Sequence, residues 1–171
     1  VSRAVGGAGL IIAEATGVLP EGRITSGCTG LWQDSQIEPL ARIVRAVKQY
    51  NAVPGIQIGH AGRKASAALP WAGGAHLSDK DGGWDIAGPT DEAFGGGLTK
   101  KPKPLDKAGI ARIVAAFRDA ARRAREAGCE WLEIHAAHGY LLNSFLSPLA
   151  NTRSDEYGGR FEDRAPPLMG G

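Results

Sequence analysis

The chain has 171 residues, of which 43% are hydrophobic and 22% charged, the composition of a globular domain with its own core. A net charge of +2 with scattered basic residues gives no reason to expect nucleic-acid binding, and no apolar run has the length of a membrane span. The amino-terminal residues lack the order of a signal peptide, and two cysteines are too few for a disulfide framework, so we expect a cytoplasmic protein with reduced thiols.

The first third of the chain predicts a strand, a helix and a second strand. Residues 9–14 form a continuous apolar run that ends at Glu14, which is typical of a buried parallel strand. A glycine-containing loop follows over residues 15–31, and Asp34 is placed to cap a helix that Asn51 ends. The apolar stripe of this helix is Ile37, Leu40, Ile43, Val44 and Val47. Residues 53–59 predict the second strand.

The rest of the chain predicts a long loop, a second helix and a third strand. Residues 65–105 are rich in glycine and proline, and a loop of this length is usually functional or contains a small hairpin of its own. Asp106 is placed to cap a helix with apolar residues at helical spacing, and Gly128 stops it. In residues 130–135, a period of two puts Leu132 and Ile134 on one face and Trp131, Glu133 and His135 on the other, which predicts a strand that ends at His135.

The order strand, helix, strand, helix, strand predicts a parallel α/β sheet with right-handed crossovers. An open doubly wound sheet and a (β/α)8 barrel both remain possible. The absence of G-x-G-x-x-G after the first strand weakens the dinucleotide-binding form. A complete barrel needs about 250 residues, so a barrel would be represented here only in part.

Polar residues occur where each predicted strand ends: Glu14 with Thr16, Gln57 with His60, and His135 with His138. Because the carboxyl ends of parallel strands share one edge, we expect these groups to converge on a ligand. The alternative interpretation is that each histidine, taken alone, is a structural residue whose hydrogen bonds are made within the protein.

Two neutral imidazoles, at His135 and His138, would donate hydrogen bonds to a substrate oxygen, and the phenol of Tyr140 would donate a proton. The alternative of a metal site is weak because no acidic or cysteine partner lies at useful spacing. The carboxamide of Gln57 offers a donor and an acceptor, as the pyrimidine edge of a flavin requires. Arg63 and Lys64 fit phosphate or nicotinamide-cofactor binding as well as ordinary surface charge.

Three segments carry a family resemblance: GLIIAEATGVLPEGRITSGCTGLW at 9–32, GIQIGHAGRK at 55–64 and HAAHGYLLNSFLSPLANTRSDEYGGRFEDR at 135–164. Together they resemble the old yellow enzyme family of FMN-dependent ene-reductases. The paired histidines and the PWAGG loop at 70–74 resemble its bacterial xenobiotic-reductase branch.

The resemblance implies a (β/α)8 barrel that binds FMN at the carboxyl ends of its strands. NADPH, or less often NADH, would reduce the flavin, and an activated alkene, an α,β-unsaturated carbonyl or nitro compound, would be reduced in turn. Carried over to this chain, His135 and His138 bind and polarise the substrate oxygen, and Tyr140 protonates the α-carbon. Gln57 and the backbone of Ala15 would contact the flavin.

The resemblance also places Lys64 at the substrate-binding mouth of the site. It gives a mainly structural role to the loop signature, which consists of Asn151, Arg153, Asp155, Tyr157, Gly158, Gly159 and Arg164. Cys28 is not the flavin-tuning residue of the family's first strand, and we interpret it as an unremarkable loop thiol.

Residues 1–171 would then form one incomplete TIM-barrel domain covering about strands two to four, with a tail at 165–171 that departs from the family pattern. Alone, such a piece should bind FMN weakly or not at all and expose apolar surface. The parent enzyme would be a homodimer or homotetramer. Two alternatives are a metal-dependent barrel hydrolase or lyase using His135 and His138, and a non-catalytic binding module, against which the intact polar residues argue.

Overall fold

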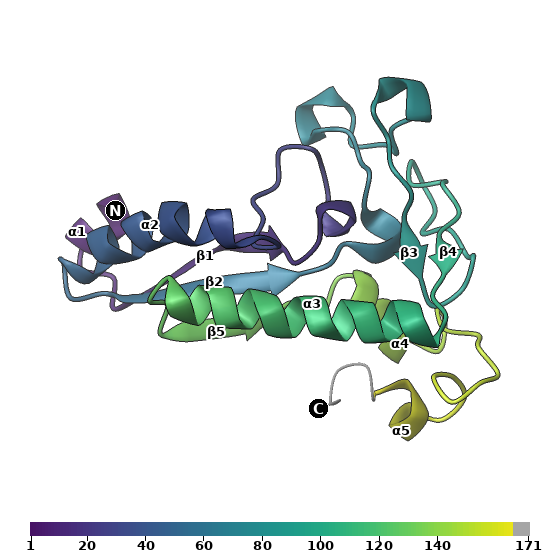
Figure 1. Ribbon diagram of the computed structural model, residues 1–171. Coiled ribbons are helices and arrows are strands. Elements are labelled where there is room, and N and C mark those ends of the chain that lie inside the picture. The colour runs from purple at the N-terminus through teal and green to yellow at the C-terminus, as the bar shows by residue number, and fades with distance from the viewer. Residues whose placement is uncertain (166–171) are drawn as a thin grey trace.

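The computed structural model describes residues 1–165 and contains a parallel sheet of three strands in the order β1-β2-β5. These strands span Leu10–Gly17, Val53–Gly59 and Trp131–Ile134. Helix α1, Ser2–Val5, precedes β1, helix α2, Ile37–Lys48, connects β1 to β2, and helix α3, Lys107–Glu126, lies between β2 and β5. In Figure 1, α2 and α3 run alongside the sheet. The predicted βαβαβ order and parallel pairing are confirmed.

Strand β2 is the centre of the packing. Its side chains Ile56 and Ile58 are buried against an alanine face of α3, formed by Ala116, Ala120 and Ala124. Alanines at every fourth position lie on one side of a helix, and their small size lets the helix axis approach the sheet closely. Substituting smaller residues for the isoleucines or larger ones for the alanines would therefore disturb the packing of α3 on the sheet.

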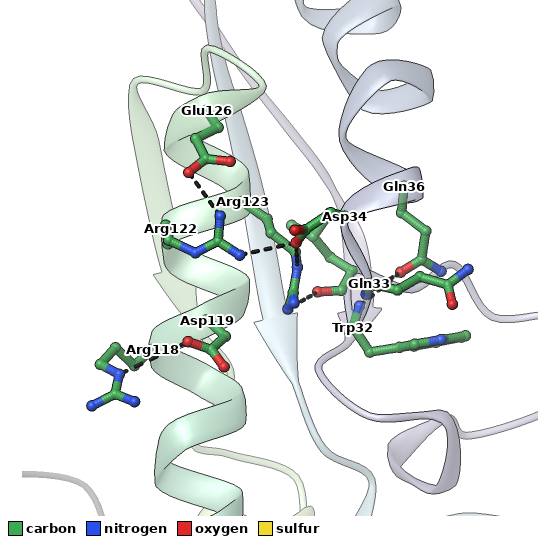
Figure 2. A network of polar contacts seen from close by, with 10 residues as sticks. Trp32, Gln33, Asp34, Gln36, Arg118, Asp119, Arg122, Arg123 and Glu126 are labelled. Atoms are coloured by element: carbon green, nitrogen blue, oxygen red, sulfur yellow. Dashed lines mark hydrogen bonds and ion pairs between the residues drawn. The ribbon is translucent and has the colours of Figure 1, made fainter.

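Helix α2 begins differently from the prediction. Its predicted cap, Asp34, instead opens a 3-10 turn at Asp34–Gln36, and its carboxylate accepts hydrogen bonds from Arg122 at 2.9 Å and Arg123 at 2.7 Å. Figure 2 shows this carboxylate between the two guanidinium groups of α3. The capping prediction is wrong because two arginines from a distant segment bind the carboxylate. The carboxylate joins the start of α2 to α3.

The predicted apolar stripe of α2 is only partly buried. Val44 and Val47 lie in the core together with Ala41, whereas Ile43 is 56% exposed. Ile43 borders an open groove between α2 and β1.

Helix α3 matches its predicted limits. The Asp106 carboxylate accepts a hydrogen bond from the N–H of Gly109 at 2.7 Å, as an N-cap should. Gly128, just past the end, has φ +91°, the left-handed conformation that favours glycine after a helix. Both predictions are confirmed.

Residues 65–105 form an excursion beyond the carboxyl end of β2 (Figure 1). It contains short 3-10 turns at Pro70–Ala72 and Asp79–Asp81, following others at Pro20–Gly22 and Gly62–Lys64. Its strands β3, Ala87–Gly88, and β4, Lys103–Pro104, pair in parallel. Strands β3 and β4 therefore do not form a hairpin, which was one of the two alternatives for this loop, since both strands run in the same direction.

The carboxyl-terminal segment contains α4, Leu141–Leu146, and α5, Phe161–Arg164, joined by the loop signature. Asn151 donates hydrogen bonds to the carbonyls of Phe145 and Tyr157, each at 2.7 Å. Arg153 donates to the carbonyls of Pro89 and Leu105, which ties this loop to the excursion. For Asn151 and Arg153, these contacts agree with the predicted structural role. The predicted departure of the tail falls, apart from Ala165, outside the described residues.

The two outer strands leave apolar side chains exposed, as the sequence predicts for an incomplete sheet. They are Leu10 and Ile12 on β1 and Trp131, Leu132 and Ile134 on β5. Among the residues described, no helix combines the length and apolar character needed to cross a membrane.

Replacement of the α3 cap, Asp106→Ala, should lower the free energy of unfolding by about 1 kcal/mol, because the N–H of Gly109 loses its acceptor. Urea unfolding of the protein at its full natural length measures this. The matched control is Asp119→Ala in the middle of the same helix, whose carboxylate forms, among residues 1–165, a single ion pair, with Arg118 at 3.9 Å. Equal losses in the two variants would contradict the capping role.

Candidate active site

The turn after β5 gathers the predicted catalytic side chains. His135 follows the strand directly, and His138 and Gly139 both adopt left-handed backbone conformations, with φ +56° and +73°. Asn143 of α4 accepts a hydrogen bond from the N–H of Gly139 at 2.9 Å, a contact that the sequence analysis missed. The reversal places Tyr140 at the N-terminus of α4.

The two imidazoles contact each other rather than pointing separately into open space. Nδ1 of His138 lies 3.2 Å from Nε2 of His135, and the Nδ1 of His135 accepts from the N–H of Ala137 at 3.3 Å. The tautomer that satisfies both contacts has the proton of His135 on Nε2, directed to His138. Nε2–H of His138 is then the outward donor of the pair.

The charge state of the site follows from burial. The pKa of His135 lies below its usual value, chiefly because of burial and then because of unfavourable electrostatic interactions of the protonated ring with His138 and Lys64. The pKa of Tyr140 is raised, mainly by burial and then by Cys28. Near neutral pH, His135 is therefore a neutral donor and Tyr140 keeps its proton. Their rings meet edge to face, 4.7 Å apart.

Gln57 lies on β2, the central strand of the sheet, between β1 and β5. Its Nε2 donates a hydrogen bond to Oε1 of Glu133, the residue paired with it on β5. Within the described chain no hydrogen bond reaches the Oε1 of Gln57, which leaves an acceptor on this strand. Glu133 was not predicted to take part.

Ala15 lies at an irregularity of the sheet. Ala13 pairs with Ile56 and Thr16 with Ile58, so two residues of β1 stand opposite Gln57 alone. A bulge of this kind removes a residue from the regular ladder and frees backbone groups for other partners. It lies beside a cavity of about 20 Å³ that His135 and Tyr140 also line.

The same cavity is lined by Cys28 and His60. Cys28 accepts a hydrogen bond from the N–H of Thr25 at 3.3 Å. Because it lines this cavity together with His135 and Tyr140, the loop thiol lies closer to the predicted site than its sequence position indicated. His60 is 2% exposed, and its Nδ1 accepts from the N–H of Gly62 at 3.0 Å. His60 is therefore a buried residue directly after the carboxyl end of β2, and burial lowers its pKa to about 4.

A cationic and aromatic cluster borders the histidine turn. Lys64 donates a hydrogen bond from Nζ to the carbonyl of His138 at 3.1 Å, and this Nζ lies 4.5 Å from the ring centre of Phe94 and 5.0 Å from that of Tyr140. The guanidinium of Arg63 lies 5.3 Å from the Phe94 ring. The sequence contained no periodic signal for Phe94, which reaches the site from the irregular excursion.

Residues 1–165 contain no group of three or more His, Cys, Asp or Glu side chains that could hold a metal ion.

Residues 1–167 match the family described as NADH:flavin oxidoreductase / NADH oxidase, which is nearly the whole chain. The chain belongs to this flavin oxidoreductase family. The predicted resemblance is therefore confirmed, and membership favours a flavin oxidoreductase over the metal-dependent hydrolase or lyase.

The chain is also similar in sequence to individual proteins that are named as flavin or NADPH oxidoreductases. An NADH:flavin oxidoreductase of Gibberella zeae is 48% identical over 161 residues, covering 92% of this chain and 39% of the relative. An NADPH dehydrogenase of Geobacillus thermodenitrificans is 46% identical over 163 residues, covering 95% and 43%. The chain thus spans less than half the length of these relatives.

The solved structure of a morphinone reductase superposes with a TM-score of 0.80 at 32% identity, covering 98% of this chain and 45% of that one. This match and the parallel βαβαβ order confirm the predicted fold class, a portion of a (β/α)8 barrel.

The buried His60 should make stability depend on pH between about 6.5 and 4. As the pH falls through this window, His60 binds a proton in the unfolded chain. In the folded protein it stays neutral, because its pKa there is about 4. The free energy of unfolding should fall by about 3 kcal/mol across the window from this residue and stay level above it.

Urea unfolding between pH 4 and 8 measures this slope. The variant His60→Asn retains an acceptor for the N–H of Gly62 but cannot titrate, so its curve should be flatter. Parallel curves for the two proteins would show that His60 does not titrate as its burial requires.

Proposed function

We propose that the protein at its full natural length is an FMN-dependent NAD(P)H oxidoreductase that reduces the activated C=C bond of α,β-unsaturated carbonyl or nitro compounds. The observation that carries the proposal is the convergence of His135, His138 and Tyr140 on one turn at the carboxyl end of β5. The names of the relatives, which include NADPH dehydrogenase, NADH:flavin oxidoreductase and morphinone reductase, support the same chemistry.

The residues present fit FMN. Gln57 offers a carboxamide whose Oε1 is unengaged in the described chain, and the bulge at Ala15 frees backbone groups beside the same edge. Gln57 would hold the pyrimidine edge, and the backbone of Ala15 would contact the ring system. When bound, FMN would take hydride from NADPH or NADH and supply it to the alkene.

The histidine pair would bind the substrate oxygen. Since His135 is neutral near pH 7, the pair presents N–H donors, and these polarise a carbonyl or nitro group without transferring a proton to it. His138 offers the outward N–H, and the N–H of His135 becomes available if the ligand oxygen displaces the contact between the rings.

Tyr140 would supply the proton that completes the reduction. Its hydroxyl is protonated near neutral pH, the more so because burial raises its pKa, and its ring lies directly against His135, so proton donor and oxygen-binding groups belong to one turn. Lys64 borders this turn, which is consistent with its predicted place at the substrate mouth. Assembly as a homodimer or homotetramer stays a prediction.

The proposal is tested with the protein at its full natural length, purified in the presence of FMN. Its visible flavin absorption should be bleached by NADPH under nitrogen and restored by an enone such as 2-cyclohexenone. In Tyr140→Phe the bleaching should proceed as before, and restoration by the enone should slow by about 10²-fold or more, because the proton donor is lost.

Two outcomes would contradict the proposal. A protein that retains no flavin would support the non-catalytic binding module instead. If NADPH bleaches the flavin but neither enones nor nitroalkenes restore its absorption, the protein accepts electrons from NADPH but does not reduce the proposed alkene substrates.

The flavin contact has its own test. Gln57→Met removes the carboxamide, and the dissociation constant for FMN, measured by fluorescence quenching, should rise about tenfold for the loss of one or two hydrogen bonds. Gln49→Met, at the exposed C-cap of α2, is the control. Unchanged FMN affinity in Gln57→Met would remove Gln57 from the flavin site.

A further inference from the structure

We propose that Lys64 is a positioning residue of the histidine pair: it binds the carbonyl of His138 and, together with Phe94, holds the His138–Gly139 turn in its left-handed conformation. This inference rests on the proposed function and deepens it. It differs from the sequence-based expectation for Lys64, which was direct contact with substrate.

The turn needs an external support. His138 has φ +56°, a conformation that side-chain-bearing residues seldom adopt, and the next residue, Gly139, has φ +73°. Such a conformation persists where surrounding contacts determine it. The direction of the His138 ring, and hence its 3.2 Å contact with His135, follows from this backbone conformation.

Lys64 supplies the contact. Its Nζ donates to the carbonyl of His138 at 3.1 Å across 74 residues of sequence, and a charged donor makes this stronger than an ordinary hydrogen bond. Within residues 1–165, no carboxylate forms an ion pair with Lys64, although most other lysines there have such a partner. Its remaining contacts are the Phe94 and Tyr140 rings, which attract an ammonium group.

Phe94 closes the other side of the arrangement. A Cβ at Gly139 would lie 2.6 Å from Cε2 of Phe94, so the ring lies directly on the turn and leaves no room for a side chain there. The ring is 41% exposed, although apolar side chains usually avoid solvent. Lys64 and Phe94 therefore couple the excursion at 65–105 to the residues that would polarise the substrate.

The test separates positioning from direct substrate binding. In the protein at its full natural length, Lys64→Met keeps the length of the side chain and removes the charged donor. We expect kcat for enone reduction to fall about tenfold with a smaller change in KM, and FMN affinity to stay as it was, because Gln57 and Ala15 are untouched.

A double-mutant cycle with His138→Ala gives the decisive result. If Lys64 acts through His138, adding Lys64→Met to His138→Ala produces little further loss. A further tenfold loss in the double variant would show that Lys64 acts on the substrate itself and would overturn the inference.

A readout independent of activity is the ¹H–¹⁵N correlation spectrum of the histidine rings. Lys64→Met should shift or broaden the His138 signals, and Phe94→Ala should do so to a smaller degree. Lys101→Met is the control, since this lysine lies in the same excursion as Phe94 but pairs with Asp91. Unchanged ring signals in folded Lys64→Met would refute positioning even if the protein reduced no alkene.

Discussion

Parallel pairing of β2 with both of its neighbours is the constraint on which the candidate site depends. It brings the carboxyl ends of β1, β2 and β5 to one edge, so that Ala15, Gln57 and His135 lie near one another although 120 residues separate the first from the last. The alanine face of α3 maintains this arrangement, because it lets the helix lie close to Ile56 and Ile58.

The site is completed by segments that do not belong to the sheet. The excursion at 65–105 brings Phe94 to the histidine turn, and Arg153 from the carboxyl-terminal loop binds the excursion through the carbonyls of Pro89 and Leu105. By fixing where the excursion lies, the loop signature contributes to the wall around the predicted catalytic residues.

Electrostatics match the proposed chemistry. Burial lowers the pKa of His135 and raises that of Tyr140, so a neutral donor and a protonated phenol coexist at one place near pH 7. Both shifts have burial as their largest cause, so the same enclosure keeps both groups uncharged. The nearby charge of Lys64 works in the same direction on His135.

The sequence alone determined the order and type of the elements, the parallel sheet, the cap at Asp106 and the edge where polar residues gather, because periodicity and helix ends are local properties of the chain. Its motifs also identified the flavin oxidoreductase family. Only the tertiary structure decided that Asp34 binds Arg122 and Arg123 instead of capping α2, that β3 and β4 pair in parallel, and that ring nitrogens of the two imidazoles contact each other. It likewise revealed the partners of Lys64, since Phe94 and His138 are distant in sequence and meet only when the excursion folds over the strand ends.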